Sequence, residues 1–156
     1  MNLSTTKTLK DHFKDFDKSN GYKGLKFGMQ KSSVKNIVTL TNQDILKQYS
    51  VVNSEYRNWF YISFEECILG FNKKNQLYEV LLSKDEFSDK EYDQFLDQII
   101  ELFGNPTKSK EEFNDSEFTS WEGKNMAILI MRKDHNLLVG FSNISLDDSS
   151  LSDKLY

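Results

Sequence analysis

The sequence lacks most of the features that mark disulfide-linked, zinc-binding or membrane-spanning proteins. Among its 156 residues there is one cysteine, Cys67, which excludes an internal disulfide and a multi-cysteine zinc site. The longest apolar run, residues 127–131, is too short to cross a bilayer. Residues 1–18 contain no apolar segment of the kind that a secretion signal requires. We therefore expect a cytoplasmic protein without a membrane span.

The motifs of common catalytic centres are also missing. The sequence has no glycine-rich phosphate loop, no G-x-S-x-G turn and no H-E-x-x-H segment. Its two histidines, His12 and His135, lie far from each other and from Cys67. Because Cys67 follows two glutamates, we expect a raised thiol pKa and a poor nucleophile. The sequence predicts no enzyme, no bound metal and no cofactor; an enzyme whose site assembles from scattered residues is one alternative.

One segment resembles part of a calcium-binding loop. Asp15, Asp17 and Ser19 alternate as the first ligands of such a loop do. The sixth position is Asn20 instead of glycine, and the twelfth is Lys26 instead of the bidentate glutamate. We therefore expect no calcium site here.

Hydrophobic periodicity indicates an α+β domain. Apolar residues recur at helical spacing in residues 6–17 and 31–47. A third helix begins after Ser88, which forms a capping box with Glu91, and ends before Gly104 and Pro106. The expected strands are Trp59–Phe64, Cys67–Phe71, Leu77–Leu82, Glu117–Trp121, Met126–Arg132 and Leu137–Asn143, with turns at residues 72–75 and 133–136.

The two halves of the sequence show a similar order of elements, helix, strand and hairpin. Trp59 and Trp121 match at an offset of 62 residues. We therefore predict one α+β domain over residues 1–146 with half-repeats at 24–84 and 85–146, followed by a flexible acidic tail. The predicted architecture is a two-layer sandwich, an antiparallel sheet with helices packed on one face. The opposite face would be free.

Charge is distributed unevenly around the formal net value of −4. Residues 1–35 carry +5 and the remaining residues −9. No aromatic side chains interleave with the N-terminal lysines in the way that nucleic-acid binding favours, so we expect no nucleic-acid partner. Residues 85–101 hold seven acids against the single Lys90. Asp93, Asp97 and Glu101 form an acidic stripe on the third helix, in which each adjacent pair costs roughly 0.2–0.5 kcal/mol. A basic partner would offset that repulsion; the alternative is a solubilising surface.

Aromatic residues form a second candidate surface. There are 21 of them, more than one small core must hold. Trp59, Tyr61 and Trp121 could form an exposed patch on the free face of the sheet, and tryptophan and tyrosine dominate binding hot spots. The alternative is that these three side chains fill the core.

The segment Gly28-Met29, followed five residues later by Val34, resembles the start of small envelope proteins of the SmpA/OmlA (BamE) type and of the related β-lactamase-inhibitor-protein fold. Gly104-Asn105-Pro106 after the third helix is similar to the same pattern. The resemblance implies a binding module that presents a sheet or helix surface to another protein.

We therefore expect a non-catalytic protein-binding domain, an inhibitor or immunity-type protein from an AT-rich bacterium that occludes a cationic toxin or enzyme. Asp93, Asp97 and Glu101 would attract the partner, while Trp59, Tyr61 and Trp121 would supply apolar contact. The alternative is an envelope-assembly module, a periplasmic or outer-membrane lipoprotein whose N-terminus is truncated. The sequence leaves the oligomeric state open.

Overall fold

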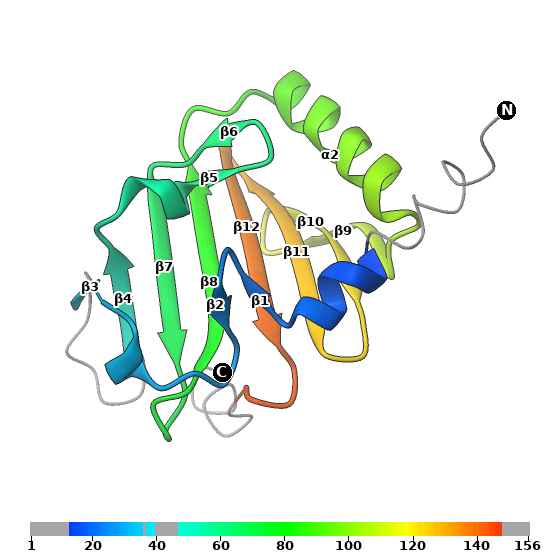
Figure 1. The fold of residues 1–156 in the computed structure, drawn as a ribbon. Helices are drawn as coiled ribbons and strands as arrows, with labels where there is room; N and C mark the ends of the chain where they lie inside the picture. The colour runs from blue at the N-terminus through cyan, green and yellow to red at the C-terminus, as the bar shows by residue number, and fades with distance from the viewer. Residues whose placement is uncertain (1–12, 36, 40–46, 148–156) are drawn as a thin grey trace, which may run out of the picture.

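An eight-stranded antiparallel sheet dominates the computed structural model, which describes residues 13–35, 37–39 and 47–147 (Figure 1). The strand order is β3-β4-β7-β8-β12-β11-β10-β9. The central neighbours β8 and β12 are distant in sequence and pair antiparallel, with Leu82 opposite Val139. The strands are β3 (Ile37–Thr39), β4 (Lys47–Val51), β7 (Glu66–Phe71), β8 (Leu77–Lys84), β9 (Lys108–Phe113), β10 (Ser116–Glu122), β11 (Met126–Lys133) and β12 (Asn136–Asn143).

Shorter elements and one long helix cover a single face of this sheet (Figure 1). They are a helical segment at residues 13–19, the hairpin β1 (Gly21–Tyr22) and β2 (Leu25–Lys26), the hairpin β5 (Asn58–Trp59) and β6 (Ile62–Ser63), and α2 (Asp89–Phe103). Two single-turn helices, η1 (Lys31–Ser33) and η2 (Ser54–Arg57), lie in the connections. The molecule is therefore mixed α and β, as predicted.

The core lies between the sheet and these covering elements. Strand alternation points one set of side chains into the core and the next set to the opposite face. In β8, Val80 and Leu82 are fully buried, whereas Leu81 between them points to the opposite face and is partly exposed. In β11, Ile128 and Ile130 are buried in the same way. The hydrophobic pattern thus fixes which face of the sheet is covered.

Helix α2 begins and ends where the sequence predicts. The Ser88 hydroxyl accepts the backbone N–H of Glu91 at 3.1 Å, and the Glu91 carboxylate accepts the backbone N–H of Ser88 at 3.2 Å. Gly104 stops the helix with φ of +86°, a conformation that glycine adopts at little cost. No helix of the described residues is long and apolar enough to cross a membrane.

The predicted helix at residues 31–47 is wrong over its described part. Only Lys31–Ser33 forms a helical turn, and Ile37–Thr39 forms the edge strand β3, with Ile37 opposite Val51. The apolar residues that suggested a helix, such as Val34 and Ile37, are β-branched and fit a sheet better. Residues 40–46 lie outside the described residues.

The predicted strand Trp59–Phe64 is also wrong as a single strand. The chain reverses at Phe60 and Tyr61, so that Trp59 pairs with Ile62 and Asn58 with Ser63. Trp59 therefore belongs to a small hairpin above the large sheet, whereas Trp121 lies in β10, and the two residues do not occupy matching places.

The other elements agree better with the sequence. The strands β7, β8, β10, β11 and β12 confirm the predicted segments to within two residues. The highly charged strand β9 was not expected. The helical residues 13–19 confirm the C-terminal part of the first predicted helix, whose earlier residues lie outside the described chain. The half-repeats and the tail remain predictions, since residues 148–156 are not described.

Asp17 fastens the helical segment at residues 13–19 to the sheet. Its carboxylate accepts the backbone N–H groups of Lys124, Asn125 and Met126 at 3.0, 2.9 and 2.7 Å, although only 7% of the residue is exposed. A Cβ atom on Gly123 would overlap this carboxylate, so glycine is required at that turn. Asp17, which in the sequence resembles part of a calcium-binding loop, thus binds the turn between β10 and β11.

Replacing Asp17 with alanine should lower the free energy of unfolding by about 2–4 kcal/mol, because three backbone N–H groups, of which that of Met126 is buried, lose a charged acceptor. Urea unfolding would measure the loss. Asp15→Ala is the matched control, since Asp15 is exposed on the same segment. Equal stabilities of the two variants would contradict the role of Asp17.

Glu79 lies in β8 beside Gly70 and Ser142, and its carboxylate packs over Gly70. Burial raises the pKa of Glu79 to about 7; the charge of Asp147 raises it further, and a hydrogen bond with Tyr78 opposes the shift. The folded protein therefore retains a proton that the unfolded chain releases above its ordinary pKa of 4.5. Stability contributed by this proton is lost as pH rises from about 4.5 to about 7.

The variant Glu79→Gln should consequently be more stable than the parent at about pH 8, by about 1–3 kcal/mol. Below about pH 4.5 the difference should vanish, because the carboxyl is then protonated in both states. Denaturant unfolding of both proteins across this range tests it. A difference that does not change with pH would rule out the titration of Glu79 as its cause.

Candidate functional site

The most exposed aromatic side chains beside α2 belong to the turn of the β5–β6 hairpin. Phe60 and Tyr61, here named the aromatic tip, are 45% and 60% exposed. Phe60 has a φ of +60°, in the left-handed region. Two-residue hairpin turns place glycine or asparagine in such positions, and a bulky side chain there costs about 1–3 kcal/mol. The sequence thus retains a large ring where stability favours glycine.

The aromatic tip is held in place by packing against α2 and the sheet. The rings of Phe60 and Tyr61 lie edge-on to Phe95, with centroids 6.3 and 6.2 Å away. Trp59, at the base of the turn, contacts Phe95 at 6.1 Å and Phe141 at 5.1 Å. Phe95 and Phe141 are fully buried. The exposed rings are therefore continuous with the hydrophobic core.

A small hollow separates the aromatic tip from the exposed surface of α2. It has a volume of about 300 Å³ and is lined by Phe60, Gln98, Glu101 and Leu102. Nearer the N-terminus of the helix, Tyr61 faces Glu91: burial raises the pKa of Tyr61, and the charge of Glu91 raises it further. The hairpin thus lies along one flank of α2, beside acidic side chains.

The three acids of the acidic stripe are all exposed on α2. Within the part of the chain that the structure describes, no lysine, arginine or histidine forms an ion pair with Asp93, Asp97 or Glu101. Glu101 lines the hollow together with Gln98. Asp93 lies about 140° around the helix axis from Gln98 and therefore on the other flank of α2. The stripe therefore crosses the helix obliquely and reaches the aromatic tip only at Glu101.

The predicted aromatic patch on the free face of the sheet is wrong, because Trp59 and Tyr61 belong to the β5–β6 hairpin on the face that α2 covers. Trp121 is 2% exposed and its indole N–H donates to the carbonyl of Gly104 at 3.0 Å, so its prediction as a contact residue is wrong. Trp59 is partly buried and supports the tip, while Tyr61 is exposed. Sequence reasoning missed Phe60, because in the expected strand Trp59–Phe64 it would point to the face opposite Trp59 and Tyr61. The structure brings Tyr61, not Trp121, beside the acidic helix.

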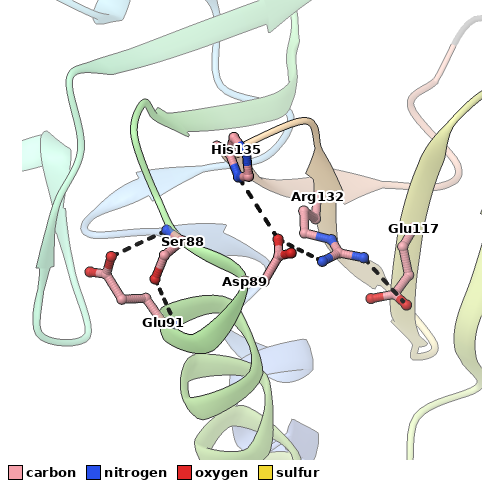
Figure 2. Close-up of polar contacts among 6 residues, drawn as sticks. All are labelled: Ser88, Asp89, Glu91, Glu117, Arg132 and His135. Atoms are coloured by element: carbon pink, nitrogen blue, oxygen red, sulfur yellow. Dashed lines mark hydrogen bonds and ion pairs between the residues drawn. The ribbon is translucent and has the colours of Figure 1, made fainter.

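A polar cluster, separate from the acidic stripe, connects the start of α2 to β10 and β11 (Figure 2). Arg132 pairs with Asp89 at 2.8 Å and with Glu117 at 4.0 Å, and its guanidinium lies 5.4 Å from the centre of the Tyr92 ring. His135 Nδ1 lies 4.0 Å from Asp89. The cluster borders an open hollow of about 540 Å³. These contacts orient the N-terminus of α2 on the sheet.

Cys67 and His135, the candidates for a nucleophile and a base among the described residues, are not brought together. Cys67 is fully buried, and burial raises the pKa of its thiol to about 12 although Lys23 and Arg57 lower it. Burial, not the adjacent glutamates, is therefore the main cause. His135 is exposed at the edge of the polar hollow, and His12 lies outside the described residues. Within the described ranges, no three histidine, cysteine or acidic residues are placed to hold a metal ion.

Comparisons with known proteins give no relative for this chain. No protein-family model, curated protein or solved structure matches it.

Replacing Phe60 with glycine should change the free energy of unfolding by less than about 1 kcal/mol, because relief of the left-handed strain offsets the lost ring contacts. Phe95→Ala should cost about 3–5 kcal/mol, as expected for a buried ring. Thermal or urea unfolding of both variants provides the comparison. If Phe60→Gly lowered the free energy of unfolding as much as Phe95→Ala, the ring of Phe60 would be retained for stability.

Proposed function

We propose that this protein is a non-catalytic protein-binding domain that engages a basic partner through the aromatic tip and the acidic stripe. The observation that carries the proposal is the pair of exposed rings, Phe60 and Tyr61, held on the core beside an acidic helix. A strained turn that exposes two aromatic side chains does not serve solubility or stability. It does serve contact with another molecule.

The two parts of the surface have different physical roles. Aromatic side chains supply most binding free energy when a partner removes them from water, and a ring that is already fixed loses little entropy on binding. Exposed carboxylates contribute mainly to the rate of encounter, through long-range attraction that salt screens. A basic protein surface with an apolar centre complements both parts. It would also relieve the repulsion within the acidic stripe.

An inhibitor or immunity-type mechanism follows if the partner is an enzyme or toxin, because a bound domain occludes it without chemistry. The proposal of a duplicated architecture rests on the order of the strands: β3-β4-β7-β8 and β9-β10-β11-β12 each run in sequence order and meet at β8 and β12. Duplicated sheets with one helical layer are also what the resemblance to the β-lactamase-inhibitor-protein fold implies.

The binding proposal is tested with the protein that remains bound to the tagged chain in an extract of its source organism. After purification, that protein should form a one-to-one complex, and the bound domain should block its activity. Reversing the three charges of the acidic stripe with Asp93→Lys, Asp97→Lys and Glu101→Lys should slow association roughly 10-fold at low salt and much less at high salt.

A matched control reverses three exposed acids of the edge strand β9 and the turn after it, Glu111→Lys, Glu112→Lys and Asp115→Lys. This variant changes the net charge equally, so only the position of the charges differs. Circular dichroism confirms that both variants fold. Association rates that fall equally in the two variants, or in neither, would refute the proposed surface.

A further inference from the structure

Building on the proposed function, we infer that the hollow between the aromatic tip and α2 receives a single lysine or arginine side chain from an amphipathic segment of the partner. The hollow has one wall from each element. The ring of Phe60 forms the first, and Gln98, Glu101 and Leu102 of α2 form the second, which thus combines an apolar side chain with an amide and a carboxylate.

A long basic side chain matches both walls at once. The methylene stem of lysine or arginine covers apolar surface while its charged end remains near water or a carboxylate. In this hollow the stem would lie between Phe60 and Leu102, and the charged end would meet Glu101. An arginine could additionally place its guanidinium over the exposed ring of Phe60.

Other side chains fit the hollow less well. An acidic side chain would be repelled by Glu101 and by the acids along α2. A wholly apolar side chain would contact Phe60 and Leu102 but would leave the Glu101 carboxylate without a cation. Charge complementarity therefore selects a basic group with an apolar stem.

The position of Glu101 supports the same conclusion. It lies in the last turn of α2, where the helix dipole is negative and where no basic residue is present. Among the described residues no cation pairs with it. A cation from the partner would be attracted by the carboxylate and by the end of the helix together. Tyr61, next to the hollow and 60% exposed, offers an apolar surface for the residues that flank this cation.

Backbone NMR of the full chain tests the inference with a synthetic amphipathic peptide of leucine and lysine at helical spacing as the probe. Saturable shifts should appear at Phe60, Tyr61, Gln98 and Leu102. Glu101→Gln should weaken binding roughly 5-fold, because one charged pair is lost, whereas the matched variant Glu111→Gln, at an exposed acid of β9, should change it less than about 2-fold. A peptide with norleucine in place of lysine should not bind at this hollow.

Equal effects of Glu101→Gln and Glu111→Gln would overturn the inference, since the peptide would then respond only to general charge. Absence of saturable shifts, or shifts confined to another surface, would overturn it as well. These results leave the proposed function standing if charge reversal of the acidic stripe still slows association with the natural partner. If that reversal has no effect, the proposed function itself fails.

Discussion

The ring of Phe141, buried at the centre of the sheet, is the contact on which the arrangement of the covering elements depends. Phe16 from the helical segment, Tyr22 from β1 and Trp59 from β5 lie 5.5, 5.0 and 5.1 Å from it. None of these elements is long enough to be stable alone, so each is placed by the aromatic side chain that it buries. Phe95 has the same role for the turn of the β5–β6 hairpin. Exposed and buried rings thus form one packed unit.

Local signals in the sequence predicted the parts of the fold that local interactions determine. The capping box at Ser88, the glycine stop at Gly104 and the alternation in residues 126–143 identify α2, β11 and β12 without tertiary information. The prediction failed where tertiary contacts decide. Ile37 belongs to a helical pattern in the sequence but pairs with Val51 at the edge of the sheet. Phenylalanine is not a typical turn residue, yet the chain reverses direction at Phe60, whose ring packs against Phe95.

The candidate surface was predictable to a similar extent. Charge spacing identified the acidic stripe because helix geometry alone places Asp93, Asp97 and Glu101 on exposed turns. No sequence pattern showed that Tyr61 would stand beside this helix while Trp121 would be buried beneath its end, because both outcomes depend on contacts between distant segments. Asp17 stood out in the sequence as part of an alternating acidic pattern, but its partners are backbone groups more than 100 positions away.

The central claim is that the core presents the aromatic tip in a fixed, strained conformation for contact with a partner. Backbone ¹⁵N relaxation of residues 58–63 in the free protein measures this most directly. The account predicts order parameters near those of the sheet, about 0.85, for both Phe60 and Tyr61. Values below about 0.6 would show a flexible loop and contradict a preformed binding surface.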